Sequence, residues 1–246
     1  MRYYFGFYHW QRHRLQLLGT LFGIATAAIG LAVGGITGVG ATVAGGGLAV
    51  LSVRGLRVLF KPSPWSLDRD RFDRLAALLP FESADTVLDI GCGTGRSVVG
   101  FAEHLDHARN IIGLDPFDED IILGNSPSLA TRNAERAELD LDVLRADGTE
   151  IPIATDSVDV VTIVQVLHDL PEAAANGILD EAARVCRPDG RVGIIELPLV
   201  NDEKPVGPEH WRTATEATGM RVENFETVPW KGDMQKVILT ARPSSS

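Results

Sequence analysis

The stretch Val87-Leu88-Asp89-Ile90-Gly91-Cys92-Gly93-Thr94-Gly95 joins an apolar run to three glycines at alternate positions. Its first part, rich in Val, Leu and Ile, is typical of a strand buried in a parallel sheet. The glycines allow a sharp turn and a close approach of a ligand to the backbone, because they carry no Cβ. A helix is predicted over about 95–105, so that the N–H groups at its N-terminus face the turn. The stretch therefore predicts a strand, a glycine turn and a helix.

A carboxylate follows the next predicted strand. The apolar run Ile111-Ile112-Gly113-Leu114 is followed by Asp115, twenty residues beyond Gly95. In a parallel sheet, a carboxylate at the tip of the neighbouring strand can accept hydrogen bonds from both hydroxyls of a ribose. Strand, glycine turn, helix, strand and acid together predict a nucleoside pocket.

Two classes of nucleoside ligand compete for this pocket. A dinucleotide-binding turn of the form G-x-G-x-x-G needs its third glycine one residue later than Gly95, where this chain has Arg96. Asp89 also places a carboxylate beside the turn, which would repel a pyrophosphate and suits a positively charged ligand. An NAD-dependent oxidoreductase is therefore the less favoured alternative.

The stretch Asp89–Gly95, D-I-G-C-G-T-G, resembles the first motif of the class I S-adenosylmethionine-dependent methyltransferases. The cofactor of that family, S-adenosyl-L-methionine, carries a positively charged sulfonium. The resemblance extends from about Thr86 to Leu197 and leaves the methyl acceptor open. Later segments match the family in order: Leu144–Gly148 (third strand and its acid), Asp156–Gln165 (fourth strand), Val166–Pro171 (the segment after it) and Ala183–Arg191 (the next helix-to-strand corner).

The resemblance also implies which residues contact the cofactor. Asp115 would bind the ribose, and Asp147 would accept from the adenine amino group. Pro116 restricts Asp115 to extended conformations, which is compatible with that role. The implied cofactor-binding residues are Asp89, Gly91, Cys92, Gly93, Gly95, Asp115, Pro116, Asp147, Gly148 and Gln165.

Methyl transfer from a sulfonium is an in-line displacement in which positioning supplies most of the rate. If the acceptor is a phenol or an amine, a general base can take its proton. His168 and Glu196, near the ends of the fourth and fifth predicted strands, are the candidate catalytic residues. The alternative for His168 is a hydrogen bond within the loop. A catalytically silent, membrane-tethered nucleoside-binding protein is the alternative to an enzyme.

Composition excludes several partners. The two cysteines, Cys92 and Cys186, lack metal-ligand spacing, and no His cluster suggests a metal, so no metal is expected. The first 61 residues contain six Lys or Arg and no acid, whereas the other 185 contain 17 bases and 33 acids. Nucleic acid is not an expected partner of so acidic a body, because phosphate binding needs clustered Lys and Arg.

From Leu15 to Val53 the chain has 39 consecutive residues without Asp, Glu, Lys, Arg or His. A single helix of that length would overshoot a hydrocarbon core of about 30 Å. Two transmembrane helices, at about 15–33 and 39–59, fit better. A cleaved signal peptide is disfavoured because its apolar region spans only about 7–15 residues. Residues 1–61 are therefore predicted to be a membrane anchor, and 62–246 a methyltransferase domain.

Basic residues at both ends of the anchor predict its orientation. Because positive flanks stay on the cytoplasmic side, the predicted location is the cell membrane, multi-pass, with a cytoplasmic catalytic domain. Such an enzyme would act on a small-molecule or lipid-type acceptor. The flanking bases are Arg12 and Arg14 before the first span and Arg54, Arg57 and Lys61 after the second.

The predicted fold class is α/β. Strands alternating with helices predict a doubly wound, seven-stranded Rossmann-like sheet. The last two strands, at about 221–227 and 236–241, are joined by a short connection, so the last strand should be antiparallel. An insertion of about ten residues follows Asp115, and it is either a cover over the adenine through Phe117 or Ile121 or a surface loop.

Overall fold

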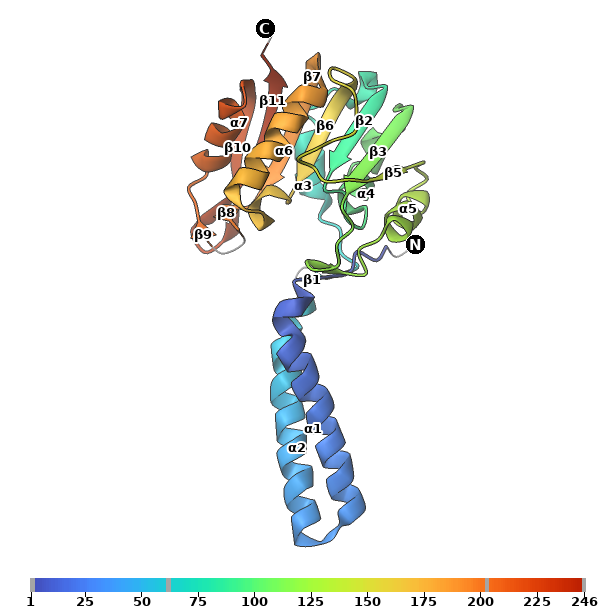
Figure 1. The fold of residues 1–246 in the computed structure, drawn as a ribbon, viewed down its shortest axis with the longest axis vertical. Helices are drawn as coiled ribbons and strands as arrows, with labels where there is room; N and C mark the ends of the chain where they lie inside the picture. Colours follow the sequence, from blue (N-terminus) through green and yellow to red (C-terminus); the bar gives the residue numbers. More distant parts are fainter. Residues whose placement is uncertain (1–2, 61–62, 202–203, 245–246) are drawn as a thin grey trace. The chain divides into compact units, whose positions relative to one another are not determined.

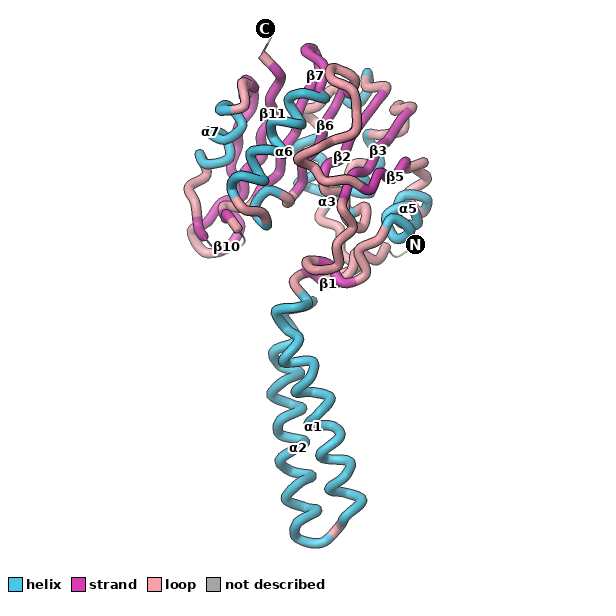
Figure 2. The backbone as a smooth tube through the Cα atoms, viewed as in Figure 1, coloured by secondary structure: helices cyan, strands magenta, loops and turns pink. Residues whose placement is uncertain are grey.

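The computed structural model describes residues 3–60, 63–201 and 204–244, and the chain forms two compact units (Figures 1 and 2). The sheet unit contains residues 67–117 and those from 126 onward, and the hairpin unit contains residues up to Ser66 together with 118–125. The predicted domain boundary between Lys61 and Pro62 lies outside the described residues. The chain therefore leaves the sheet unit after Phe117 and returns to it at Ser126.

The sheet unit is built on a seven-stranded sheet with the order β10-β11-β7-β6-β2-β3-β5. The five strands from β7 to β5 are parallel, and β11 is antiparallel to both of its neighbours. This order confirms the predicted α/β sheet with an antiparallel last strand. The strands are β2 (Thr86–Ile90), β3 (Asn110–Asp115), β5 (Asp142–Arg145), β6 (Val158–Val164), β7 (Cys186–Glu196), β10 (Met220–Lys231) and β11 (Met234–Pro243).

Helices cover both faces of this sheet, as Figure 1 shows. Alternate strand residues face opposite sides, so that Val87 packs on one face and Leu88 on the other. One core contains residues of α6 (Glu172–Val185) and α7 (Glu209–Ala217). The other contains residues of α3 (Arg69–Ala76), α4 (Arg96–Gly100) and α5 (Pro127–Glu135).

Strand β7 begins earlier than the predicted 191–197. It starts at Cys186, which pairs with Val158, and the pairing with β6 then shifts so that Arg191 lies opposite Val160. The intervening residues form an irregularity of the bulge type, in which Pro188 can be accommodated within a strand. Two further pairs of short strands were not predicted: β1 (Phe7–Tyr8) with β4 (Ile122–Leu123), and β8 (Leu199–Val200) with β9 (Lys204–Pro205).

The hairpin unit contains two long apolar helices, α1 (Arg14–Val33) and α2 (Gly35–Leu56). Gly34 separates them with φ +67°, so the break is a single residue and the second helix begins at Gly35 rather than near residue 39. Both helices are long and apolar enough to cross a membrane by length and composition. Their large side chains are mostly exposed, including Leu31 at 74% and Ile36 at 94%.

Small residues bring the backbones of α1 and α2 into contact. A Cβ added to Gly23 would lie 2.6 Å from the Ala49 nitrogen, and one added to Gly45 would lie 2.5 Å from the Ala27 nitrogen. The small residues in contact are spaced four apart in each helix, Gly23 and Ala27 in α1 and Gly45 and Ala49 in α2. Close backbone approach of this kind stabilises helix pairs where the solvent gives no hydrophobic driving force.

The insertion after Asp115 belongs to the hairpin unit. Its residues 118–125 include β4, in which Leu123 pairs with Phe7 and Ile122 with Tyr8. Asp118, Glu119 and Asp120 are exposed, as the surface-loop alternative predicts, and the cover over the adenine stays a prediction. The backbone pairing with the amino-terminal segment was not predicted, because it cannot be read from local sequence.

Asp89 ties three elements of the sheet unit together. Its buried carboxylate accepts hydrogen bonds from the hydroxyls of Ser97 in α4 and Thr162 in β6, the latter at 2.6 Å. Burial raises the pKa of Asp89 to about 6, against the lowering effect of these two hydrogen bonds. The Asp89 carboxylate, which the sequence placed beside a positively charged ligand, therefore joins β2 to α4 and β6.

We predict a pH-dependent stability difference for Asp89→Asn. The folded-state pKa of about 6 lies above the ordinary aspartate pKa of 3.8. Folding therefore becomes less favourable as the pH rises between these values, because the folded chain holds a proton that the unfolded chain has lost. The amide has no such transition. The free energy of unfolding of the variant should therefore gain about 2–3 kcal/mol relative to the unaltered chain between about pH 4 and pH 6. Urea unfolding across that range measures it, and a pH-independent difference would contradict the assignment.

We also predict that Gly45→Val separates α1 from α2, whereas the neighbouring Gly46→Val does not. A Cβ at Gly45 meets backbone atoms, while Gly46 has no heavy atom within 4 Å of its added Cβ. The overpacking should cost about 1–3 kcal/mol. Spin labels at the exposed positions Leu18 and Leu51 should report a longer, broader distance distribution for Gly45→Val alone. Equal distributions for both variants would show that the two helices do not pack through Gly45.

Candidate functional site

The glycine turn follows β2 at the carboxyl edge of the sheet. Gly91, Gly93 and Gly95 all have positive φ, at +72°, +52° and +79°, which explains why glycine occupies these positions. The turn is held by β3, because the N–H groups of Gly91 and Cys92 both donate to the Leu114 carbonyl, at 2.7 and 3.0 Å. A Cβ at Gly91 would lie 2.4 Å from Val166 Cγ2. The turn is thus a closely packed backbone surface.

Asp115 lies directly beside this turn at the end of β3. Its Oδ2 accepts from the Gly93 N–H at 2.9 Å, and its Oδ1 accepts from the Phe117 N–H at 2.6 Å. The side chain is buried and held at both oxygens. A carboxylate only accepts hydrogen bonds when it is ionised, which is the chemistry that recognition of ribose hydroxyl groups needs.

Two residues of the predicted site pack in the core instead of facing outward. Cys92 is buried, and a Cβ added to Gly113 would lie 2.9 Å from its sulfur. Burial, followed by the charges of Asp89 and Asp115, raises the pKa of the Cys92 thiol well above its usual value. Gly148 is also buried, and an added Cβ there would lie 3.1 Å from Ile178. Both positions shape the site from behind.

The remaining predicted residues on the nucleoside side lie on loops after β3 and β5. Asp147 is exposed, and its Oδ1 accepts from the N–H and hydroxyl of Thr149, at 2.9 and 2.8 Å. The Pro116 carbonyl accepts from Arg145 Nη1 at 2.7 Å, and the Arg145 guanidinium lies 5.3 Å from the centre of the Phe117 ring. Arg145 therefore fixes the segment that follows Asp115.

Sequence reasoning missed the polar residues that support the turn. Buried Asn133 of α5 donates from Nδ2 to the Thr94 carbonyl at 2.8 Å, and Ser97 and Thr162 bond to Asp89. A polar residue at a predicted core position was the available signal for Thr162, which interrupts the apolar run of β6. No local pattern distinguishes Asn133 from a surface residue of a helix.

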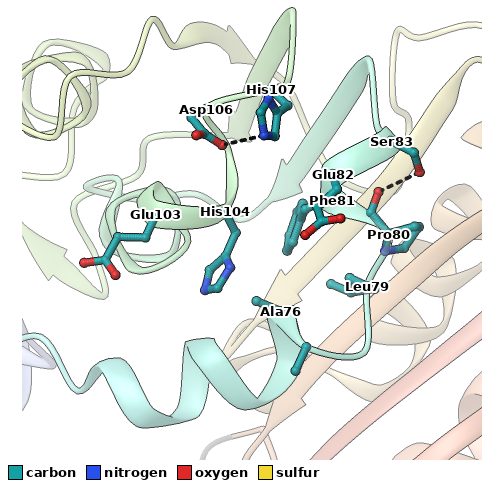
Figure 3. A pocket seen from close by; sticks show the side chains of 11 residues that line it. Ala76, Leu79, Pro80, Phe81, Glu82, Ser83, Glu103, His104, Asp106 and His107 are labelled. Atoms are coloured by element: carbon teal, nitrogen blue, oxygen red, sulfur yellow. Dashed lines mark hydrogen bonds and ion pairs between the residues drawn. The ribbon is translucent and has the colours of Figure 1, made fainter.

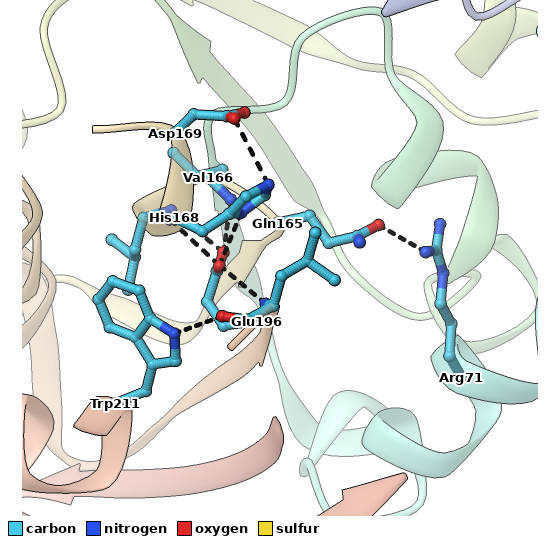
Figure 4. Close-up of polar contacts among 9 residues, drawn as sticks. Arg71, Gln165, Val166, His168, Asp169, Glu196 and Trp211 are labelled. Carbon is cyan, nitrogen blue, oxygen red and sulfur yellow. Dashed lines mark hydrogen bonds and ion pairs between the residues drawn. The ribbon is translucent and has the colours of Figure 1, made fainter. Parts of the chain in front are cut away.

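His168 and Glu196, the two candidate catalytic residues, are in contact (Figure 4). His168 Nδ1 lies 2.8 Å from Glu196 Oε2, and because an ionised carboxylate only accepts, Nδ1 carries the hydrogen. His168 Nε2 lies 3.5 Å from Asp169 Oδ1. The structure therefore joins the ends of β6 and β7 through a His–carboxylate pair.

Glu196 is fully buried and accepts four further hydrogen bonds from the backbone. The N–H groups of Val166 and Leu167 reach Oε1 at 2.6 and 3.1 Å, and those of His168 and Leu197 reach Oε2 at 3.2 and 3.1 Å. Such a carboxylate orders the turn η5 (Leu167–Asp169) that follows β6. This placement favours a positioning role for Glu196 behind His168.

Gln165 lies between this turn and helix α3, as Figure 4 shows. It has φ +55°, a strained value for a residue other than glycine, and its Oε1 accepts from Arg71 Nη1 at 2.5 Å. Lys236 of β11 pairs with Val228, which packs in the core that contains the α3 residues. Burial and the nearby Arg71 charge lower the pKa of Lys236. A polar, partly basic rim thus borders the carboxyl edge next to α3.

A separate hollow lies at the opposite, amino edge of the sheet (Figure 3). Its walls come from the end of α3 and from the turns η3 (Phe81–Ser83) and η4 (Ala102–His104). His104 Nε2 lies 3.2 Å from Asp73 Oδ1 there. Because η3 precedes β2, this hollow is remote from the glycine turn and does not belong to the candidate site.

The residues at the carboxyl edge fit S-adenosylmethionine. Asp115 places a carboxylate at the end of β3, and the turn has glycine at three positions beside the switch point between β2 and β6. Asp147, on the loop after β5, offers an exposed carboxylate. Among the residues that the structure describes, no group of three His, Cys, Asp or Glu side chains could hold a metal ion.

Comparison with known proteins agrees with this site. Residues 87–190 match the protein family described as "Methyltransferase domain". A demethylmenaquinone methyltransferase of Lactobacillus johnsonii is 31% identical over 118 residues, which are 48% of this chain and 46% of the relative. A 27-O-demethylrifamycin SV methyltransferase of Amycolatopsis mediterranei is 33% identical over 139 residues, which are 56% and 47%.

A solved structure extends the likeness of the fold. The cyclase SpnF superimposes with a TM-score of 0.60 at 20% identity, covering 72% of this chain and 82% of its own. The chain spans about half the length of the two methyltransferases it matches, so the likeness concerns one region of each. The matched residues 87–190 include the glycine turn, Asp115 and His168. This part of the chain is therefore similar to a methyltransferase domain.

Proposed function

We propose that this protein transfers a methyl group from S-adenosylmethionine to a small-molecule acceptor and that its amino-terminal hairpin tethers it to a membrane. The observation that carries the proposal is the carboxylate of Asp115, held between the N–H groups of Gly93 and Phe117 beside the glycine turn. The bound cofactor would supply a methyl group already activated by the sulfonium. The chain's own residues then orient the two reactants and exclude water.

On the acceptor side, the geometry supports a base with a positioned imidazole. With Nδ1–H donated to Glu196, a neutral imidazole would accept a proton at Nε2, the atom that lies 3.5 Å from Asp169 Oδ1. If the acceptor is a phenol or an amine, His168 would take its proton as the carbon–oxygen or carbon–nitrogen bond forms. The relatives' names concern a demethylmenaquinone and a 27-O-demethylrifamycin, both small molecules.

Three observations support the membrane tether. Helices α1 and α2 expose large apolar side chains along their length. Aromatic rings gather where the amino-terminal segment meets the end of the hairpin, with Phe7 and Phe60 at 5.3 Å between ring centres. The bases Arg12, Arg14, Arg54 and Arg57 lie at the same end of the hairpin, which favours a cytoplasmic location for that end and for the methyltransferase domain.

A catalytically silent binding protein is the second candidate. The fold also resembles that of a cyclase, so the fold by itself does not imply methyl transfer. Asp115 and the glycine turn serve cofactor binding in both cases. Cofactor binding and methyl transfer therefore need separate tests.

Asp115→Asn should weaken the binding of S-adenosylhomocysteine roughly ten- to a hundredfold, because an amide has one acceptor oxygen where the site uses two. Isothermal titration of the full-length chain in detergent measures the affinity. Asp142→Asn, the same change at an exposed position where β5 begins, is the control and should bind as the unaltered chain does. Equal affinity of both variants would contradict the role of Asp115, and tight binding of NAD would contradict the cofactor.

His168→Gln should lower methyl transfer by roughly 10²- to 10⁴-fold while leaving S-adenosylhomocysteine affinity within about twofold. The measurement is the transfer of labelled methyl groups from the cofactor to a solvent extract of membranes, compared with the protein fraction. His104→Gln, at the amino edge, is the matched control and should transfer at the unaltered rate. Unchanged transfer in His168→Gln would contradict a role of His168 as the general base.

A further inference from the structure

The hairpin unit is not one continuous segment. It takes in residues 118–125, which begin three residues after Asp115, and the chain re-enters the sheet unit at Ser126 before α5. The loop that follows the candidate ribose acid is therefore built into the unit that carries the apolar helices. We define residues 5–11 together with 118–125 as the clip.

Backbone hydrogen bonds join the two halves of the clip. Phe7 pairs with Leu123 and Tyr8 with Ile122 in an antiparallel ladder, and the His9 N–H donates to the Ile121 carbonyl at 2.6 Å. A two-residue ladder is too short to be stable by itself, so it depends on the contacts around it.

Side chains of the amino-terminal half reach the tip of the loop. Trp10 Nε1 donates to the Glu119 carbonyl at 2.7 Å, and Gln11 Nε2 donates to Asp120 Oδ1 at 2.5 Å. Within the loop, Asn125 Nδ2 donates to the Asp118 carbonyl at 3.2 Å and draws its two ends together.

Gly6 permits the closest approach in the clip. It has φ +73°, and a Cβ added there would lie 2.6 Å from Ile122 Cγ2 and 2.7 Å from the Leu123 carbonyl oxygen. One of these two atoms belongs to the backbone, so a side chain at Gly6 cannot be accommodated by a rotamer change alone. The neighbouring Phe5 is fully buried, and its N–H donates to the Pro64 carbonyl at 2.7 Å.

The other end of the loop is fastened to the candidate ribose acid. Phe117 has φ +55° and donates its N–H to Asp115 Oδ1 at 2.6 Å. The next residue, Asp118, already belongs to the clip. A change in the path of the chain at 118 therefore acts on the hydrogen bond that orients the Asp115 carboxylate.

We propose that the amino-terminal segment 5–11 is a positioning element for the cofactor: by pairing with 118–125 it orders the chain after Asp115 and so presets the ribose-binding carboxylate. The inference rests on the proposed binding of S-adenosylmethionine. Its physical basis is entropic, because a loop that is already ordered does not lose conformational freedom when the cofactor binds. By linkage, the bound cofactor must stabilise the clip in return.

The test compares Gly6→Ala with Gly34→Ala in the full-length chain, held in nanodiscs of phosphatidylcholine and phosphatidylglycerol. Both glycines have positive φ, which alanine rarely adopts, but an added Cβ at Gly34 meets no heavy atom within 4 Å. Isothermal titration with S-adenosylhomocysteine should show affinity lowered roughly five- to tenfold by Gly6→Ala and within about twofold for Gly34→Ala. Trp10→Phe, which removes only the donor to Glu119, gives a milder loss in the same direction and serves if Gly6→Ala does not fold.

Amide hydrogen exchange supplies a readout that a merely structural role would not move. Added S-adenosylhomocysteine should slow exchange at Phe7, Tyr8 and 121–123 in the unaltered chain and in Gly34→Ala, and much less in Gly6→Ala. Normal affinity in Gly6→Ala, or exchange in the clip that ignores the ligand while the unaltered chain binds it, would overturn the inference and leave the proposed function intact. Failure of the unaltered chain to bind would overturn both.

Discussion

The end of β3 holds the glycine turn in place, and the rest of the site is arranged around that support. The Leu114 carbonyl accepts from two successive N–H groups of the turn, and Asp115 accepts from a third, at Gly93. The turn has positive φ at three glycines, and these hydrogen bonds fix one conformation among the many that glycine can adopt. In the proposed function the same carboxylate binds the ribose, so that support of the turn and recognition of the ligand would depend on one side chain.

Two further buried carboxylates organise the neighbouring strands. Asp89 joins β2 to α4 and β6 through the hydroxyls of Ser97 and Thr162. Glu196 gathers four backbone N–H groups and His168 Nδ1 at the ends of β6 and β7. Burial of such groups is tolerable because each carboxylate oxygen accepts at least one hydrogen bond. Both act through the elements they hold, whereas His168 and Asp115 are the side chains proposed to meet ligands.

The hairpin unit adds a constraint of another kind. Its helices pack through glycines at which a Cβ would meet backbone atoms, and its amino-terminal segment pairs with the loop that follows Asp115. A hairpin joined only by a linker would leave the candidate site unaffected. Because this unit also incorporates residues 118–125, it is joined to the candidate site by the short stretch of chain from Asp118 to Asp115.

Local sequence was sufficient for the seven-stranded sheet, the glycine turn, Asp115 and the two apolar helices, because strand and helix periodicity, glycine spacing and uncharged length are properties of contiguous residues. The sequence placed His168 and Glu196 near the ends of two strands of one parallel sheet, which end at the same edge, and the structure brings the two side chains into contact. Only the tertiary structure decided that Asp89 is buried, that Asn133 supports Thr94, and that residues 118–125 pair with Phe7 and Tyr8. The contact of Asn133 joins residues 39 apart and the pairing with Phe7 joins residues 116 apart, and no local pattern records which distant groups will meet.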